Sequence, residues 1–288
     1  MKRIESRDNK WIKRLNGLKI KKNRDKEGLF IAEGLRFIRE IPKNWEVLAY
    51  AVSDAFAAEN DLSPYEEKAE VLCLTDALFA AVCDTENPQG ILAVCKKLDW
   101  VADAVLAKKT PFLLLAEELN DPGNLGTVIR TADACGADAV FLSKGSVDLY
   151  NPKVLRATMG SLFHVPVFQN IDLHALSEKM QAKQIPLYAA HLKGDRYPYA
   201  LPLQDACAFL IGNEARGLSE DAAALCDAWV KTGWTTSPTM PPSISRRRML
   251  ARHRRRHDFI SLCDRDCRNK STFSVKLSSF VTKRTVPL

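Results

Sequence analysis

The sequence lacks any apolar run that approaches the roughly 18 residues of a membrane-spanning helix. Its N-terminal stretch, MKRIESRDNKWIKRL, is charged and is not followed by the apolar segment of a secretory signal. No internal repeat is evident either, which argues against a solenoid or a propeller. These absences predict a globular cytoplasmic protein that neither crosses nor binds a membrane.

The sequence also lacks the cysteine spacing of a disulfide framework. Its eight cysteines are scattered through apolar segments, which predicts buried, reduced thiols. One grouping has spacings that imitate a zinc site, namely His253, His257, Cys263 and Cys267. The surrounding tail shows no folding pattern, so we expect no metal site there.

Charge is unevenly distributed along the 288 residues. The formal net charge of +7 divides into +8 for residues 1–26, −11 for residues 27–231 and +10 for residues 232–288. Trp11, Ile12 and Leu15 interrupt the basic N-terminal segment, which is therefore a candidate amphipathic helix whose Lys/Arg face meets phosphates. A solvated charged helix explains the same charges equally well.

The chain contains two series of alternating strands and helices. Residues 1–98 have the short elements of a small α/β domain, and a second series begins with the apolar run PFLLLAEEL at 111–119. Strands separated by helical segments in this second series predict βαβ units and a parallel sheet covered on both faces. We place the domains at 1–105 and 106–231, followed by an aberrant basic tail at 232–288.

The first candidate site is D-P-G-N-L-G at 121–126, between a predicted strand and a predicted helix. This is the carboxyl edge of the sheet, where α/β proteins bind ligands. We expect Thr127 to begin a helix whose free N–H groups face an anion, with a bent loop that brings Asn124 near its first turns. Arg130 would then direct a fixed cation at a phosphate or a developing oxyanion. Taken alone, the segment is more often a common turn followed by a solvated arginine.

The second candidate site is G-N-E-A-R-G-L at 212–218, which follows the apolar strand CAFLI. Ser219 comes next and is a predicted helix N-cap. Two glycines around polar residues at a strand end form a candidate backbone cradle for a nucleoside. The order differs from G-x-G-x-x-G, so a dinucleotide site is not favoured. Taken alone, the segment is more often a tight strand-to-helix connection.

Taken together, LNDPGNLGTVIRTADACG at 119–136 and FLIGNEARGLS at 209–219 closely resemble the first two motifs of the SpoU/TrmH-type RNA 2′-O-ribose methyltransferases. NPKVLRATMGSLFHVPV, between them, resembles that family too. FIAEGLRFIREI and NPQGILAVC resemble its small substrate-binding domain, which is similar to a ribosomal L30e-like fold. The resemblance implies an α/β protein in which a small L30e-like α/β domain precedes a parallel-sheet SPOUT-like domain with a C-terminal trefoil knot.

The resemblance also implies an activity, namely methyl transfer from S-adenosyl-L-methionine to a ribose 2′-hydroxyl of RNA, with rRNA favoured over tRNA. It implies a homodimer and no metal. By motif position, Arg130 is the expected catalytic arginine, acting with the substrate phosphate, and Asn124 and Glu214 organise the site. The expected cofactor-binding residues are Leu210, Ile211, Gly212 and Gly217.

A third family motif, roughly I-P-M-x-G-x-x-x-S-L-N-V-S-x-A, is missing after Lys231. If Arg246, Arg247 and Arg248 are CGN codons, reading one nucleotide earlier gives NCG, which encodes small residues or Pro. The same offset turns Met240 into NAT, which includes Asn, and the two following prolines into NCC, which includes Ala. A frameshift near residue 232 would therefore restore an Asn-Ala-Ala segment. We expect the chain as written to bind S-adenosyl-L-methionine poorly and to have an unstable or unknotted C-terminal half.

Other interpretations remain open. Residues 232–288 can be a genuine basic tail whose Arg-rich ARHRRRHD binds nucleic acid. The whole chain can be a non-catalytic RNA-binding protein that uses its N-terminal domain and its basic ends. The two glycine loops by themselves are also compatible with a generic nucleotide-binding α/β protein.

Overall fold

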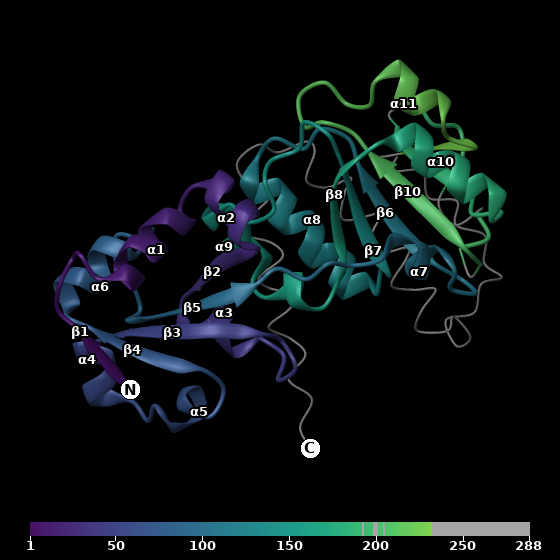
Figure 1. Cartoon of the computed structure of the whole chain (residues 1–288). Helices are drawn as coiled ribbons and strands as arrows, with labels where there is room; N and C mark the ends of the chain where they lie inside the picture. Colours follow the sequence, from purple (N-terminus) through teal and green to yellow (C-terminus); the bar gives the residue numbers. More distant parts are fainter. Residues whose placement is uncertain (192, 198–200, 204, 232–288) are drawn as a thin grey trace, which may run out of the picture. The chain divides into compact units, whose positions relative to one another are not determined.

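A computed structural model describes residues 1–191, 193–197, 201–203 and 205–231. The described residues pack as two units, one formed by Met1–Asp99 with Asp148–Phe163 and the other by Trp100–Val147 with the described residues between 164 and 231 (Figure 1). The sequence predicts one boundary near residue 105, with every residue before it in the first domain and every residue after it in the second. The packing differs, because residues 148–163 belong to the N-terminal unit. Within the described ranges, no helix combines the length and the apolar character needed to cross a membrane.

The N-terminal unit is built on a five-stranded mixed sheet with strand order β1-β4-β3-β5-β2. Strand β4 pairs in parallel with β1 and β3, and β5 pairs antiparallel with β3 and β2. The strands are β1 (Lys2–Ile4), β2 (Leu29–Glu33), β3 (Val47–Ser53), β4 (Glu70–Leu74) and β5 (Ile91–Lys96). The helices are α1 (Lys10–Leu18), α2 (Lys21–Glu27), α3 (Leu35–Arg39), α4 (Asp54–Glu59), α5 (Ser63–Glu66) and α6 (Asp76–Val82).

Helix α1 confirms the amphipathic helix expected in the basic N-terminal segment. Asn9 caps it by accepting a hydrogen bond from the Trp11 backbone N–H, which satisfies one of the free donors of the first turn. Trp11, Ile12, Leu15 and Leu18 are buried at helical spacing. They share one core with side chains of α6 and of the sheet, so Lys10 and Lys13 are left exposed. Figure 1 shows α1 and α6 next to this sheet.

The segment 148–163 completes the N-terminal unit with α9 (Pro152–Thr158) and the 3-10 turn η1 (Ser161–Phe163). Asn151 caps α9 by accepting the backbone N–H of Lys153, and Pro152 takes the first helical position. The Phe163 ring lies 4.8 Å from that of Trp45 and 5.1 Å from that of Phe37, measured between centroids. Helix α9 packs against β2, so a stretch from the middle of the sequence covers the edge strand of this sheet.

The second unit contains a six-stranded sheet with order β11-β9-β10-β6-β7-β8, in which every strand pair is parallel. The strands are β6 (Phe112–Ala116), β7 (Ala139–Ser143), β8 (Val167–Ile171), β9 (Leu187–His191), β10 (Cys207–Ile211) and β11 (Ala228–Lys231). The helices are α7 (Ala102–Leu106), α8 (Pro122–Cys135), α10 (Leu173–Ala182) and α11 (Glu220–Ala224). The predicted parallel sheet is confirmed.

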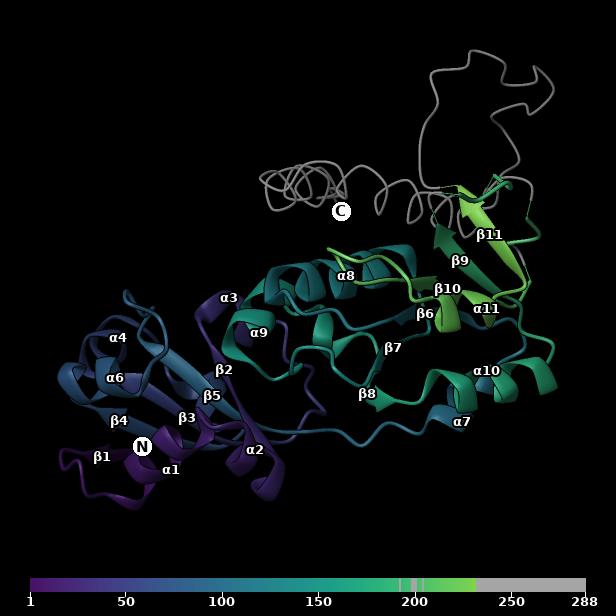
Figure 2. The same ribbon diagram turned by 90° about the horizontal axis from the view of Figure 1, so that it is seen from above.

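Helices cover both faces of this sheet, as parallel strands buried on two sides require. Helices α7, α10 and α11 share one core with alternate residues of the strands, including Leu113, Phe141 and Leu210. Helix α8 lies on the opposite face (Figure 2). Gly136 ends α8 in a left-handed conformation with φ 71°, which glycine adopts without the strain of a Cβ.

Six cysteines of the described residues are free thiols, five of them buried and Cys226 partly buried, as the sequence predicts. Burial raises the pKa of Cys83, Cys95 and Cys226 to about 12, so these thiols are inert at neutral pH. No group of three or more candidate metal ligands occurs in the part of the chain that the structure describes. The His253 to Cys267 grouping and the residues expected to complete a knot lie outside that part.

Candidate functional site

The two motif loops meet at the carboxyl ends of β6 and β10. These strands are neighbours, and their register pairs Ala116 with Ile211. The backbone N–H of Glu117 then donates to the Ile211 carbonyl over 2.9 Å, which keeps the chains together beyond the strand ends. The chain leaves β6 toward β7 on one side and leaves β10 toward β11 on the other. Such a switch point is where open parallel sheets bind ligands.

The start of α8 corrects the expected geometry of the first motif. The helix begins at Pro122 and not at Thr127, because Asp121 acts as N-cap and its carboxylate accepts the Asn124 N–H over 2.7 Å. Proline suits the first helical position, where its missing N–H costs no hydrogen bond. The segment D-P-G-N is therefore a helix cap and not a bent loop, and Asn124 lies in the first turn.

This correction separates Asn124 from Arg130. Six residues of α-helix place them about 9 Å apart along the axis and about 120° apart around it. Arg130 is partly buried, and burial lowers the pKa of its guanidinium below the ordinary value. No hydrogen bond or ion pair joins the Arg130 side chain to another residue within the described ranges. It is thus a partly desolvated cation that has no anionic partner among the described residues.

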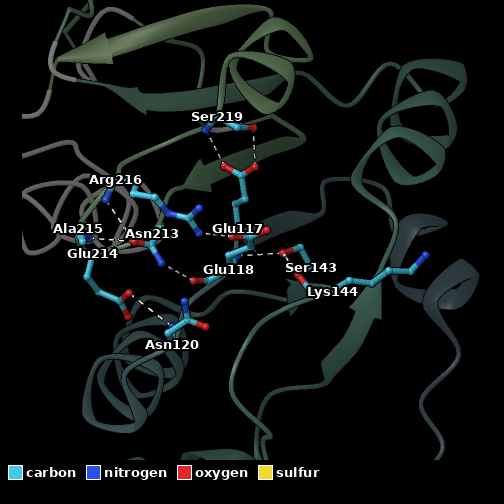
Figure 3. A network of polar contacts seen from close by, with 10 residues as sticks. All are labelled: Glu117, Glu118, Asn120, Ser143, Lys144, Asn213, Glu214, Ala215, Arg216 and Ser219. Carbon is cyan, nitrogen blue, oxygen red and sulfur yellow. Dashed lines mark hydrogen bonds and ion pairs between the residues drawn. The ribbon is translucent and has the colours of Figure 1, made fainter.

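Glu214 connects the second loop to the first. Its carboxylate accepts the backbone N–H of Asn120 over 3.4 Å (Figure 3). It also accepts the backbone N–H of Asp121 over 3.2 Å. With the Asp121 carboxylate on the Asn124 N–H, two protein carboxylates already occupy the N-terminal end of α8. The anion that we expected to face this helix end would therefore meet negative charge there. The structure brings Glu214 and Asn124 into one cluster, linked through Asp121.

Asn213, which the sequence analysis did not assign, shapes the second loop from inside. Its Oδ1 accepts the backbone N–H of Ala215 over 2.9 Å and that of Arg216 over 3.2 Å. Its Nδ2 donates to the Glu118 carbonyl over 2.7 Å, and its backbone exchanges two hydrogen bonds with Gly217. A buried amide with its hydrogen bonds made in this way rigidifies the loop.

Glu117 and Glu118 were also missed by sequence reasoning. Both Glu117 carboxylate oxygens bind Ser219, accepting its N–H over 2.9 Å and its hydroxyl over 2.6 Å. Ser219 caps α11 through the Ala222 N–H, as predicted. Glu118 forms an ion pair with Arg216. The signal available in the sequence was two acidic residues directly after an apolar strand, at the edge where ligands bind.

The four residues expected to bind the cofactor differ in side-chain burial and in the space next to their backbone. The Leu210 side chain is fully buried in the core, so it has no surface for a ligand, and Ile211 is partly buried at the strand end. A Cβ at Gly212 would lie 2.2 Å from the Gly217 carbonyl carbon, so loop closure itself requires glycine there. Gly217 has φ +74° and open space on its Cβ side, where a ligand has room to approach the backbone.

Replacement of Gly212 by alanine is expected to destabilise the second unit by about 1–3 kcal/mol, because the new Cβ forces the loop backbone apart. The loss is measured by urea unfolding monitored through tryptophan fluorescence. Gly17→Ala is the control, since a Cβ at that helical position meets its nearest neighbour at 3.5 Å. That variant should be neutral or slightly more stable. Equal stability of both variants would contradict the close approach at Gly212.

A parallel sheet with two interlocked polar loops at its switch point defines an α/β protein with a candidate ligand site at the carboxyl edge. Residues 111–233 match the model of the SpoU rRNA Methylase family, and residues 9–93 match that of the MRM3-like substrate binding domain. The 23S rRNA (guanosine(2553)-2′-O)-methyltransferase RlmP of Bacillus subtilis is 36% identical over 226 residues, which cover 78% of this chain and 87% of that protein. The chain belongs to the SpoU rRNA methylase family.

Other proteins agree with this membership. Human mitochondrial rRNA methyltransferase 3 is 34% identical over 156 residues, which cover 52% of this chain and 37% of that protein. A crystal structure of an rRNA methyltransferase from Sinorhizobium meliloti superposes with a TM-score of 0.70 at 25% identity, covering 81% of this chain and 90% of that one. The AdoMet-bound form superposes at 0.72 with 23% identity, covering 90% and 95%, and adds support for the fold alone. The expected family and its α/β parallel-sheet fold are confirmed.

Proposed function

We propose that this chain is an S-adenosyl-L-methionine-dependent RNA methyltransferase that acts on a ribose 2′-hydroxyl. The observation that carries the proposal is the pair of hydrogen bonds from Asn120 and Asp121 to Glu214, which join the two motif loops at the switch point. Arg130 lies on the helix that begins there, and its side chain has no hydrogen-bond or ion-pair partner among the described residues. The relatives are named as rRNA 2′-O-methyltransferases, which supports the same reaction here. They also support rRNA over tRNA as the substrate.

Methyl transfer requires that the ribose 2′-oxygen is aligned with the methyl group and that the charge that develops on this oxygen is stabilised. S-adenosyl-L-methionine, when bound, supplies an electrophilic methyl group, so the chain must place the 2′-oxygen in line with it and help the hydroxyl proton to leave. Arg130 would bind the phosphate next to the target ribose, because a guanidinium forms two parallel hydrogen bonds with phosphate oxygens. Its partial burial strengthens this attraction, because less water screens it. Asn124 and Glu214 hold the start of α8 in place.

We propose that the described residues form one side of the cofactor site. The open backbone at Gly217 and the strand end at Ile211 would contact the nucleoside part, with Gly212 allowing the loop to close. Leu210 would take part only through its backbone, because its side chain lies in the core. We propose that the other side is formed by the third family motif, whose position falls after Lys231 and outside the described residues.

We retain the proposal that a frameshift near residue 232 removed this third motif. The match to the family model ends at residue 233, directly after β11, which supports it. The proposed consequence is an impaired enzyme as written, and a homodimer in the cytoplasm when the frame is intact. Sequencing the genomic locus tests the proposal, and finding no intact alternative frame there would refute it.

Methyl transfer itself is tested with labelled S-adenosyl-L-methionine and deproteinised rRNA, using this chain beside a version restored to the alternative frame after Lys231. We expect transfer to ribose 2′-oxygens by the restored chain and little or none by the chain as written. Transfer by neither, together with RNA affinity that falls steeply with salt, would instead favour a non-catalytic RNA-binding protein, for which the basic segment at 1–26 is the supporting observation.

A further inference from the structure

We propose that Glu118 is a positioning residue that holds the second loop, and with it Glu214, against the start of α8. This inference rests on the proposed function, because it concerns the same site. Glu118 has no assigned role in the two motifs, yet it makes three polar contacts with two distant segments, namely the end of β7 and the second loop. Figure 3 shows it between the second loop and the end of β7.

The backbone of Glu118 is in an unfavourable conformation. Its φ of 47° lies in the left-handed region, which residues with a Cβ rarely adopt. Two hydrogen bonds keep it there, because its N–H donates to the Ser143 hydroxyl over 2.9 Å and its carbonyl accepts from Asn213 Nδ2 over 2.7 Å. The bend directs residues 119–121 toward Glu214. Unfavourable backbone conformations that the surroundings maintain in this way cluster at functional sites.

The identity of the residue points to the role of its side chain. Glycine would adopt this backbone conformation without strain, so the conformation by itself does not account for glutamate. The carboxylate forms an ion pair with Arg216. Gly145 leaves room for the same side chain, since a Cβ there would lie 3.3 Å from Glu118 Cγ. The side chain therefore lies against the end of β7 on one side and reaches the second loop on the other.

The two contacts to the second loop lie on both sides of Glu214. Asn213 precedes it and bonds to the Glu118 carbonyl, and Arg216 follows it and pairs with the Glu118 carboxylate. Holding both flanks fixes where the Glu214 carboxylate can reach, namely the N–H groups of Asn120 and Asp121. The ion pair is exposed, with 69% of the Arg216 and 45% of the Glu118 side chain accessible. Such pairs contribute little to folding stability, so positioning is its main effect.

The test uses the full chain and measures amide hydrogen exchange at Asn120 and Asp121 by NMR. For Glu118→Gln and for Arg216→Gln, we expect exchange at these two amides to rise by about two- to fivefold, the equivalent of one exposed ion pair. The melting temperature should stay unchanged. The charge-reversed double variant, Glu118→Arg with Arg216→Glu, should restore the protection. Lys179→Gln, which breaks the exposed Lys179–Asp103 pair of the same unit, is the matched control and should leave both amides unaffected.

The exchange measurement does not depend on catalysis, so the two proposals can fail separately. If the restored-frame chain transfers no methyl group, the proposed function fails while the exchange data still decide the role of Glu118. If it is active, Glu118→Gln should lower kcat with little change in the KM for RNA. Unchanged exchange in both single variants, or a double variant no better protected than either, would overturn the positioning role.

Discussion

Replacement of Asp148 by alanine is expected to destabilise the N-terminal unit by about 3–5 kcal/mol, because it leaves a buried guanidinium without its anion. Arg24 is only 4% exposed, and its Nη2 donates to Asp148 over 2.6 Å. Its Nη1 donates to the carbonyls of Leu18 and Lys19 at the end of α1. Loss of the carboxylate would therefore affect α1, α2 and the segment 148–163 together.

The effect is large because typical domains have only about 5–15 kcal/mol of net stability. Urea unfolding of the full chain measures it, with Asp84→Ala as the control. Asp84 forms a 2.9 Å ion pair with Arg156 in the same unit, but 40% of its side chain is exposed, so its loss should cost less than about 1 kcal/mol. Similar losses in the two variants would mean that the Arg24–Asp148 pair is not buried in solution.

A double variant separates the effect of the lost charge from that of lost packing. Arg24→Met combined with Asp148→Leu removes both charges and keeps apolar volume, and it should recover most of the stability lost in Asp148→Ala. No recovery would show that the carbonyls at the end of α1 depend on the Arg24 guanidinium itself. The pair would then act chiefly as a cap for α1, which lacks a basic residue in its last turn.

Arg130→Lys is expected to reduce methyl transfer by about 100-fold or more in the restored-frame chain. Lysine keeps the positive charge but lacks the planar guanidinium, which forms two parallel hydrogen bonds with phosphate oxygens. Stability should hardly change, since within the described part of the chain the Arg130 side chain has no hydrogen-bond or ion-pair partner to lose. Steady-state kinetics with rRNA fragments measure the effect, with Arg196→Lys as the control at an exposed arginine of the same unit.

The size of the loss separates two roles for Arg130. A residue that acts only through general electrostatic attraction to RNA would raise KM and would lose little when replaced by lysine. A residue that orients one phosphate beside the reacting hydroxyl lowers kcat. Wild-type activity in Arg130→Lys would rule out the proposed catalytic role.

Local patterns predicted the elements well, and the main error shows why they fail at a site. The segment D-P-G-N fits both a turn and a helix cap, because Asp and Pro favour each. The cap forms in this chain with Glu214 bonded to the two residues where α8 begins, more than 90 positions further along the sequence. A pattern of neighbouring residues does not predict that Glu214 is the partner. The early start of α8 and the separation of Asn124 from Arg130 were therefore not predictable from the segment alone.

Short-range chemistry by itself determined the parallel sheet, the helix ends at Gly136 and Ser219, and the presence of two polar loops at strand ends. These follow from hydrophobic period, capping and glycine conformation, which act over a few residues. Only the tertiary structure decided that Glu118 pairs with Arg216, 98 positions away, and that Arg24 pairs with Asp148, 124 positions away. The physical reason is that such pairs depend on which distant segments the strands bring together. The spacing of residues along the sequence does not predict these contacts.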